Sequence, residues 1–300
     1  MCPEGVVAVN RKPSVMMDLL RLGVMDTDAA LANHHRIAEV IGADPSRLAE
    51  WEHHLDTCCD PDLALTALAD LAQEYAQCVG ELLGDDASAC RLVRLLGASS
   101  EFGHHLIAHP DDLAEVTRDP VRLGRDEILN DLLEVVGAHR EGEFMVAETP
   151  IGPASDRLRL ANRRHLVRIA SRDVDADDPT EIIEDIAAEL ADLADAIVTA
   201  ALALARADCP NHADARLAVV AMGKCGAQEL NYISDVDVIY VAEPARDDVS
   251  GPRAVTIATK LAASVAKMCS AHTGAGSIWQ VDAALRPEGN AGPLVRTMDS

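Results

Sequence analysis

The stretch AMGKCGAQELNYISDVDVIYVAEP, residues 221–244, places a glycine-containing turn between two apolar segments. Residues 216–222 (RLAVVAM) and 236–243 (VDVIYVAE) are rich in β-branched side chains, which predicts two strands. Gly223 and Gly226 lie in the connection, where the missing side chains let backbone N–H groups approach a phosphate closely. Asp235 and Asp237 stand at the start of the second strand, two residues apart and therefore on one face.

A third carboxylate lies further along the chain. Residues 277–285 (SIWQVDAAL) alternate between apolar and polar side chains, which predicts another strand with Asp282 inside it. If the two strands that carry Asp235, Asp237 and Asp282 are neighbours, the carboxylates converge and repel one another unless divalent cations bind. Oxygen ligands suit magnesium, and a pair of ions can clamp both oxygens of a phosphoryl transfer. We therefore predict that the glycine turn holds phosphate and the aspartates hold metal.

Other interpretations of the Asp-x-Asp pattern remain to be weighed. On its own, the pattern is usually a solvated strand end or a turn. Phosphatases of the haloacid-dehalogenase type and metal-dependent glycosyltransferases also use it, but there it follows an apolar strand. Here residues 230–234 (LNYIS) precede Asp235 and the apolar strand comes after, which argues against both classes.

Composition limits the partners. Lys and Arg total 26 and Asp and Glu total 50, so the net charge of −24 repels the phosphate backbone of nucleic acid. The eight cysteines are scattered without a C-x-x-C spacing, which predicts reduced thiols in a cytoplasmic protein. No signal peptide and no uncharged apolar run of roughly 18 residues stands out, so we expect no membrane partner.

The first two thirds of the chain has the periodicity of helices. Asp60–Pro61 predicts the start of a helix that ends at Gly84, and Asp178–Pro179 predicts the start of another that ends near Ala207. The second carries an apolar stripe of Ile183, Ile186, Leu190, Leu193 and Ile197. Shorter helices are predicted around residues 14–22, 27–41, 87–96, 127–136 and 157–171, and another over 254–271 with Ala258, Leu261, Val265 and Met268 on one face.

We therefore predict an α+β protein, with a mostly helical region over residues 1–210 and an α/β unit over residues 211–300. The chain stops shortly after an apolar run, without a helix to cover the second side of the sheet. We expect that the α/β unit is truncated at its C-terminal end.

Two long motifs resemble one protein family. GKCGAQELNYISDVDVIYV (residues 223–241) is similar to the first signature of the glutamine synthetase adenylyltransferases, and GSIWQVDAALRPEGNAGPLV (276–295) is similar to their second. Residues 94–113 and 163–174 also resemble helices of that family, so the likeness spans about residues 92–295. Two long motifs in the right order are far more specific than Asp-x-Asp alone.

The resemblance implies a DNA-polymerase-beta-like nucleotidyltransferase fold in a bifunctional enzyme much longer than this chain. One half of such enzymes transfers AMP from ATP to a tyrosine of glutamine synthetase. The N-terminal half removes it with inorganic phosphate and releases ADP. Because a start methionine, a helical region and one transferase motif come in that order, we expect this chain to be the adenylyl-removing half. Glutamine synthetase is then the expected partner, and two Mg²⁺ ions, a nucleotide (ATP, ADP or AMP) and phosphate the expected ligands.

The family motifs map onto individual residues. Asp235, Asp237 and Asp282 are the expected metal-binding and catalytic residues, and the expected nucleotide or phosphate ligands are Gly223, Lys224, Gly226, Ser234 and Arg286. The chain departs from the family pattern at Cys225, Ala227, Ala284 and Asn290. Three of these changes remove features that help hold phosphate: a second turn glycine is replaced by Ala227, a common arginine by Ala284 and a frequently basic residue by Asn290. They bear on phosphate binding and leave the three aspartates intact.

Several further features have two interpretations. Arg164, Arg168 and Arg172 form a basic stripe that either binds phosphate or an acidic partner, or pairs with nearby acids such as Asp173 and Asp175. The pairs His34–His35, His53–His54 and His104–His105 suggest metal sites, but neighbouring helical residues do not share a face, which favours surface histidines. Lys224 either neutralises phosphate or is a solvated turn residue.

Two alternative functions stay open at this stage. The same chemistry could act on another substrate, nucleic acid or an antibiotic, although the charge of −24 and the long second motif argue against these. Alternatively, the chain is a non-catalytic scaffold whose helices dock glutamine synthetase or a nitrogen-status signalling protein. Magnesium-dependent nucleotide binding would separate these hypotheses, because a scaffold predicts none.

Overall fold

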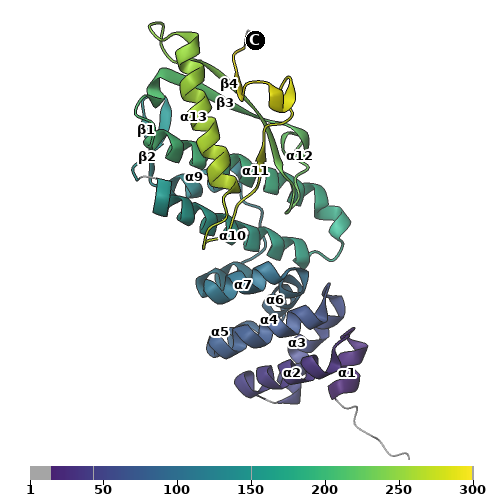
Figure 1. The fold of residues 1–300 in the computed structure, drawn as a ribbon. Helices are drawn as coiled ribbons and strands as arrows, with labels where there is room; N and C mark the ends of the chain where they lie inside the picture. Colours follow the sequence, from purple (N-terminus) through teal and green to yellow (C-terminus); the bar gives the residue numbers. More distant parts are fainter. Residues whose placement is uncertain (1–14, 43, 150, 299–300) are drawn as a thin grey trace, which may run out of the picture. The chain divides into compact units, whose positions relative to one another are not determined.

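A computed structural model describes residues 15–42, 44–149 and 151–298 of the chain. The chain divides into two compact units, residues 1–119 and residues 120–300, which are described separately below. The predicted functional boundary near residue 210 stays a prediction. Figure 1 shows that the first unit is built of helices and that the larger sheet lies in the second.

The first unit is a set of short helices. Its described elements are α1 (Val15–Arg21), α2 (Thr27–Ile41), α3 (Pro45–Glu52), η1 (His53–Thr57), α4 (Pro61–Glu74), α5 (Ala76–Leu82), α6 (Asp86–Ala98), α7 (Ser100–Ala108), η2 (Pro110–Leu113) and α8 (Ala114–Thr117). Asp60 caps α4 as predicted, because its carboxylate accepts a 2.9 Å bond from the N–H of Leu63. The predicted helix 60–84 is broken at Tyr75, which leaves helical geometry and donates its hydroxyl to the carbonyl of Ile107 at 2.7 Å.

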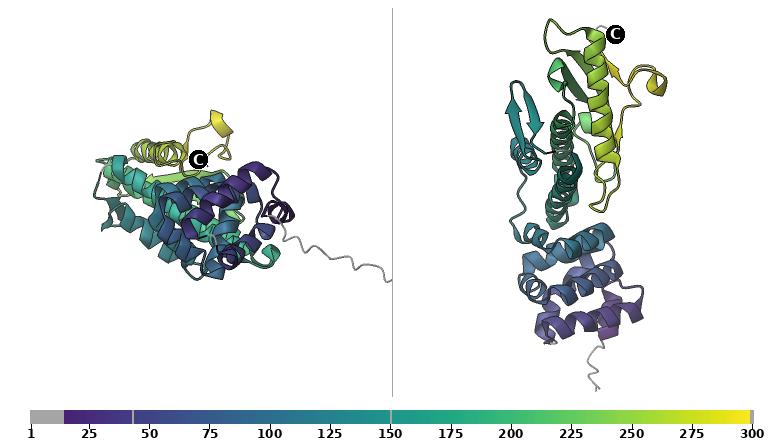
Figure 2. Two further views of the ribbon diagram at one scale, coloured as in Figure 1. Left: turned by 90° about the horizontal axis from the view of Figure 1, so that it is seen from below. Right: turned by 60° about the vertical axis from the view of Figure 1, so that its left-hand side comes forward.

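The second unit begins with three helices and a small hairpin. The elements are α9 (Arg125–Val135), β1 (Ala138–Glu141), β2 (Phe144–Ala147), α10 (Ile151–Asp175) and α11 (Pro179–Ala207). The hairpin was not predicted. Its strands pair antiparallel around Gly142, whose φ of +61° suits a tight turn. The right-hand view of Figure 2 shows this hairpin apart from the larger sheet.

Helix α11 supplies much of the core of this unit. Asp178 caps it, and Ile186, Leu190, Leu193 and Ile197 are buried, as the apolar stripe predicts. The prediction is wrong for Ile183, whose side chain is 63% exposed. Ile183 lies in the first two turns of the helix, before the buried run begins at Ile186.

The larger sheet is built from short, mixed strands. The elements are η3 (His212–Asp214), β3 (Ala215–Ala221), α12 (Gly223–Gly226), β4 (Val236–Pro244), α13 (Gly251–Ser270), β5 (Val281–Asp282), η4 (Gly289–Ala291) and β6 (Val295–Arg296). β4 pairs antiparallel with β3 on one edge and parallel with β5 and β6 on the other. The strand predicted over 277–285 is only two residues long, because the Asp282 carboxylate accepts a 2.7 Å bond from the N–H of Ala284 and turns the chain.

The two faces of this sheet differ. Val236, Val238, Tyr240 and Ala242 of β4 are buried, whereas the residues between them are partly exposed. Helix α13 lies alongside β3 and β4 (Figure 1) and packs beside α11; its predicted apolar face of Ala258, Leu261, Val265 and Met268 is buried. The α+β class is therefore confirmed, with the helices on one side of the sheet.

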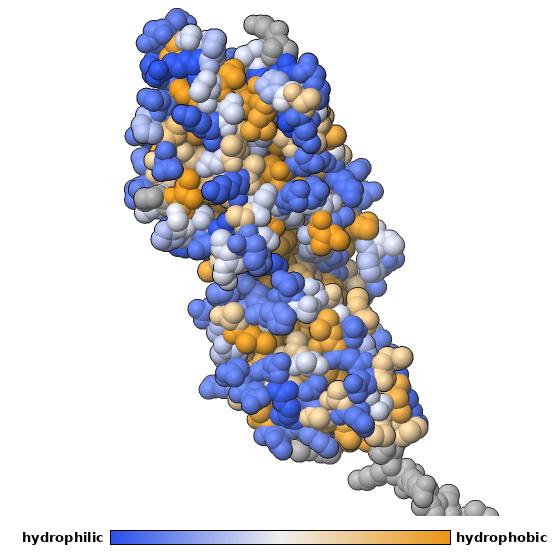
Figure 3. Space-filling view, in the orientation of Figure 1, coloured by the Kyte–Doolittle hydropathy of each residue, from blue (hydrophilic) through white to orange (hydrophobic). Residues whose placement is uncertain are grey.

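The surface of the molecule is mixed in character. Hydrophilic residues predominate on the face shown in Figure 3, and apolar residues appear there in small groups. Within the described residues, no helix has both the length and the apolar character needed to cross a membrane.

Candidate functional site

The turn after β3 depends on two glycines. Gly223 has a φ of +52°, and a side chain there would place its Cβ 2.5 Å from a carboxylate oxygen of Asp237. A Cβ on Gly226 would lie 2.5 Å from the backbone oxygen of Ala221. Real Cβ atoms do not come this close to other atoms, so both positions require glycine in this conformation. The first of them puts the turn directly against an aspartate of the predicted site.

The sheet register brings two of the predicted aspartates together. β4 and β5 are parallel, and Asp237 lies directly opposite Asp282 across the pair. Directly opposite residues project to the same face, and Asp235 precedes Asp237 by two residues. This is the more open face of the sheet, since Asp235 is exposed and Asp237 and Asp282 are half-buried. The strands that carry Asp237 and Asp282 are thus neighbours, and the convergence of all three carboxylates around metal ions stays a prediction.

The three carboxylates lack positive partners. Within residues 15–42, 44–149 and 151–298, none of them forms an ion pair. Among the described residues, one group of three His, Cys, Asp or Glu side chains has its ligand atoms within 4.8 Å of one another, and it lies elsewhere in the chain. The oxygens of Asp235, Asp237 and Asp282 are therefore not all within this distance of one another. A metal role for these three carboxylates therefore stays a prediction.

The side chains predicted to bind phosphate have local partners. The ammonium of Lys224 is 3.4 Å from the hydroxyl of Ser234. The Arg286 guanidinium donates to the backbone oxygen of Ala283 and, at 3.4 Å, to the side chain of Asn290. Arg286 is thus held within the loop that follows Asp282, and in this conformation it bonds to that loop.

Two departures from the family pattern have a structural explanation. Ala227 has a φ of −84°, an ordinary value for a residue with a side chain, so replacing glycine there brings no backbone strain. Cys225 is buried, and burial, followed by the charges of Asp195 and Asp237, raises the pKa of its thiol to about 11. Cys225 is therefore a packing residue and a poor nucleophile at neutral pH.

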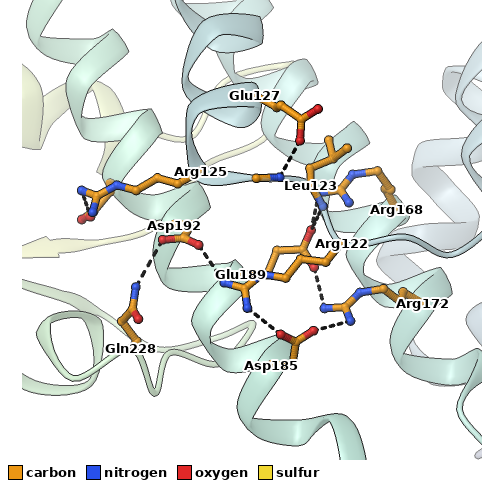
Figure 4. A network of polar contacts seen from close by, with 12 residues as sticks. Arg122, Leu123, Arg125, Glu127, Arg168, Arg172, Asp185, Glu189, Asp192 and Gln228 are labelled. Atoms are coloured by element: carbon orange, nitrogen blue, oxygen red, sulfur yellow. Dashed lines mark hydrogen bonds and ion pairs between the residues drawn. The ribbon is translucent and has the colours of Figure 1, made fainter.

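The basic stripe on α10 is internal. Arg168 pairs with Glu189 at 2.8 Å, and Arg172 pairs with both Asp185 and Glu189 at 2.6 Å (Figure 4). Glu189 is fully buried. The stripe thus pairs with acids, but those acids lie on α11, and the predicted partners Asp173 and Asp175 are not among them. Arg164 likewise pairs with Asp131 at 2.7 Å, so the stripe does not form a free phosphate-binding surface.

A further arginine completes this network, which we call the α10–α11 ion network: Arg122, Arg168, Arg172, Asp185, Glu189 and Asp192. Arg122 pairs with Asp185 and, at 2.9 Å, with Asp192. Burial alone would raise the pKa of Asp185, but the bonds from Arg172 and Arg122 outweigh it and hold that pKa below its usual value. The acids recur at spacings of four and three along α11, so they share one face of the helix.

The ion network is connected to the loop that leads to the aspartates. The side-chain amide of Gln228 donates to Asp192 at 3.2 Å, as Figure 4 shows. Tyr232 donates its hydroxyl to Asp173 at 2.9 Å, and burial, with the Asp173 charge, raises the pKa of this phenol. The indole of Trp279 donates to the backbone oxygen of Tyr232 at 3.3 Å. These anchors were not predicted, because they depend on which helix faces the loop; the only sequence signal is the polar and aromatic content of residues 228–232.

A cavity of about 410 Å³ lies on the other side of the sheet. It is lined by Val236 and Val238 of β4, residues of α11, and the Arg125–Asp195 ion pair of 2.7 Å. Burial raises the pKa of Asp195, against the opposing charge of Arg125. Because the strand residues that line it alternate with Asp237, this cavity does not open onto the face of the three carboxylates.

The comparisons with known proteins agree with the motifs. The pattern describing the glutamate-ammonia ligase adenylyltransferases matches residues 89–300, more than half of the chain. The chain belongs to this family. A bifunctional glutamine synthetase adenylyltransferase/adenylyl-removing enzyme from Cutibacterium acnes is 86% identical over 292 residues, which are 97% of this chain and 30% of that protein. Proteins of the same description from Streptomyces avermitilis (43% identical over 307 residues) and Bifidobacterium longum subsp. infantis (38% over 299) cover 98% and 96% of this chain and 28% of their own length.

The family assignment confirms the resemblance drawn from residues 223–241 and 276–295. The chain spans less than a third of the length of these curated relatives. The family is that of nucleotidyltransferases, and the relatives carry two activities in their description. Assigning one of them to this chain is a separate step.

Proposed function

We propose that this chain removes AMP from an adenylylated tyrosine of glutamine synthetase by phosphorolysis, with release of ADP. One observation carries the proposal: Asp237 and Asp282 lie opposite each other on neighbouring strands, and Gly223 of the turn lies against the Asp237 carboxylate. This places the glycine turn beside a face of carboxylates that form no ion pairs, an arrangement suited to phosphoryl and nucleotidyl transfer. The DNA-polymerase-beta-like fold type is part of the same proposal.

In the proposed reaction, an oxygen of inorganic phosphate attacks the adenylyl phosphorus. The bond from phosphorus to the tyrosyl oxygen breaks, the tyrosyl oxygen takes up a proton, and the attacking phosphate becomes the terminal phosphate of ADP. Asp235, Asp237 and Asp282 would hold two Mg²⁺ ions, which would neutralise the charge of the reacting phosphates. Lys224 and the backbone amides of Gly223 and Lys224 orient the attacking phosphate, while the N–H of Gly226 donates to the backbone oxygen of Met222 within the turn.

The remaining predicted ligands support this arrangement. Ser234 lies within reach of Lys224 and fixes the position of its ammonium group. Arg286 is the proposed second cation at the phosphates, and its bond to the backbone oxygen of Ala283 keeps it in the segment next to Asp282. The loss of the arginine at position 284 leaves Arg286 as the nearest guanidinium in this loop.

Removal is favoured over attachment of AMP by the order of elements. A helical region precedes the transferase motif in this chain, which is the order that the resemblance implies for the adenylyl-removing half. The proposed location is the cytoplasm, which agrees with the seven described cysteines, all of them free thiols.

The test uses adenylylated glutamine synthetase as substrate and measures ADP formed when inorganic phosphate is added. It is carried out with the 300-residue chain and with a polypeptide extended to the length of the relatives. Asp235→Asn combined with Asp237→Asn should abolish ADP release and Mg²⁺-dependent binding of ADP. Asp247→Asn, an exposed carboxylate in the loop after β4, is the matched control and should leave both unchanged.

Each outcome discriminates between functions. ADP release that needs phosphate and the two aspartates supports removal. AMP transfer from ATP to unmodified glutamine synthetase, without ADP release from the modified form, would assign the opposite half-reaction. If even the extended polypeptide shows no Mg²⁺-dependent nucleotide binding, the result would support the hypothesis of a non-catalytic scaffold. Phosphate-dependent release that survives the double substitution would refute the roles of the two aspartates.

A further inference from the structure

A cluster of metal-binding side chains lies in the first unit, separate from the carboxylates of the sheet. His53 and His54 stand at the start of η1, and Asp86 is the first residue of α6. One ligand atom from each of the three lies within 4.8 Å of the others. We propose that His53, His54 and Asp86 bind a divalent transition-metal ion of the zinc class, which links η1 to α6.

The distances fit such an ion. The Nε2 atoms of His54 and His53 lie 3.1 Å and 3.6 Å from the same Oδ1 of Asp86. Ligand atoms about 2.0–2.1 Å from a tetrahedral zinc ion are about 3.3–3.4 Å apart, so the two observed distances lie on either side of this value. Small rotations of the exposed His53 and Asp86 side chains would complete the geometry without movement of the backbone.

The tautomer of His53 favours a cation at this place. Its Nδ1 is 3.1 Å from the backbone oxygen of Ala49, which can only accept a hydrogen bond, so Nδ1 carries the proton. In the neutral ring, Nε2 then directs a lone pair toward the Asp86 carboxylate. A metal ion between Nε2 of His53 and Oδ1 of Asp86, which lie 3.6 Å apart, would accept a lone pair from each of them. An N–H bond from Nδ1 to a backbone carbonyl is also the usual support of a metal-binding histidine.

The adjacent histidines can share a site because they are not in a regular α-helix. Side chains of neighbouring α-helical residues diverge, which is the reason for expecting surface histidines here. The chain changes from α3 to the 3₁₀ helix η1 at His53, and the ring centroids of His53 and His54 lie 3.8 Å apart. The rule that neighbouring helical residues do not share a face therefore does not apply where α3 meets η1.

The three side chains differ in their exposure to solvent. The His54 side chain is 8% exposed, whereas those of His53 and Asp86 are 57% and 81% exposed. An ion can therefore enter from solvent and keep a water ligand. Two imidazoles and one carboxylate select zinc, cobalt, nickel or copper over magnesium, which prefers oxygen ligands. The site is thus chemically distinct from the proposed magnesium site on the sheet.

The cysteines that follow η1 are not part of the cluster. Cys58 is half-buried, and burial, followed by the charge of Cys59, raises the pKa of its thiol to about 11. A metal must displace this thiol proton before sulfur can bind. The experiment separates nitrogen and oxygen ligation from sulfur ligation.

The test measures zinc bound per chain by equilibrium dialysis of the metal-free 300-residue protein in excess Mg²⁺, which occupies hard oxygen sites. The wild-type chain should bind one zinc ion at the cluster. His53→Ala and Asp86→Asn should each weaken that binding at least about 100-fold, since even the loss of an indirect support costs 10–100-fold. His104→Ala, which removes an exposed histidine of α7, is the matched control and should bind as the wild type does. Circular dichroism checks that each variant folds.

Two further readouts make the result decisive. Cobalt in place of zinc should give visible absorption without a sulfur-to-cobalt charge-transfer band, and zinc should raise the unfolding midpoint of the wild-type chain but not of His53→Ala. Zinc binding that is equal in all variants, a strong sulfur band, or a wild-type chain that binds no zinc would each overturn the proposal. Because the assays measure metal binding, loss of ADP release in the other experiments does not affect them.

Discussion

The sharpest prediction concerns Gly223→Ala. Gly223 adopts a φ of +52°, and a Cβ there would lie 2.5 Å from Asp237, whereas ordinary contact begins near 3.4 Å. An L-residue in this left-handed region costs about 1–2 kcal/mol. We expect the free energy of unfolding to fall by about that amount, because the close atom is the terminal carboxylate oxygen of Asp237, which can move aside at little further cost.

The effect on the site should be much larger than the effect on stability. The methyl group pushes the Asp237 carboxylate away from the turn by a substantial part of an ångström. A misplacement of about 1 Å at a reacting centre can cost about 100-fold in rate, so we expect a loss of this order in ADP release, and weaker Mg²⁺-dependent binding of ADP. Urea unfolding followed by circular dichroism and calorimetric titration with ADP measure the two quantities.

The control for this experiment is Gly251→Ala. Gly251 is the first residue of α13, as Gly223 is of α12, but it has no positive φ and no atom lies within 4 Å of its built Cβ. Alanine there should be neutral or stabilise the chain by about 0.4–1 kcal/mol, with ADP binding unchanged. If Gly223→Ala matched this control in both stability and binding, the argument that Gly223 positions Asp237 would be refuted.

Three further predictions test the network and the sheet. Glu189→Ala removes the ion-pair partner of the mostly buried Arg168 and one of the two partners of Arg172, and should cost about 3–5 kcal/mol in urea unfolding, whereas the exposed Glu184→Ala on the same helix should cost far less. Asp282→Asn removes a like charge directly opposite Asp237, so the metal-free chain should gain about 0.2–1 kcal/mol while its Mg²⁺ affinity drops; a loss of stability without metal would contradict the register. The His165 bond, followed in importance by the Arg164 charge, lowers the pKa of Asp131 in the folded state. The ionised Asp131 carboxylate therefore makes its full contribution to the free energy of unfolding above the unfolded pKa of about 3.9. This contribution is lost as the pH falls through the lower pKa of the folded state, so the stability of Asp131→Asn should fall less steeply with decreasing pH.

Some of the structure follows directly from local sequence. The Asp–Pro helix starts at residues 60–61 and 178–179 were predictable because both residues act within one turn of the chain. The strands 215–221 and 236–244 were predictable from their β-branched content, and the common face of Asp235 and Asp237 from the period of two. These features depend on a few neighbouring residues, which is the range over which sequence patterns carry information.

Other features depend on which segments meet. The hairpin Ala138–Ala147 has four-residue strands, too short and too polar in its first strand (AHRE) to show alternation. The break at Tyr75 is stabilised by the carbonyl of Ile107, 32 residues away. The partners of Arg168 and Arg172 lie on α11 and not on their own helix. In each case the deciding contact is distant in sequence, so no local pattern could reveal it.

The residues between the glycine turn and the aspartates illustrate why a motif can contain positions with no direct chemical role. Leu230 is buried, Tyr232 bonds to Asp173 of α10, and Gln228 bonds to Asp192 of α11. Buried ion pairs contribute little net stability compared with well-packed apolar residues, so the α10–α11 ion network is not explained by stability alone. Asp192 accepts bonds from both Arg122 and Gln228, so the network and the loop share a residue. A loop attached at Gln228 and Tyr232 has little freedom to shift along β4, and the point at which Asp235 enters the strand is therefore fixed relative to the helices as well as to the sheet.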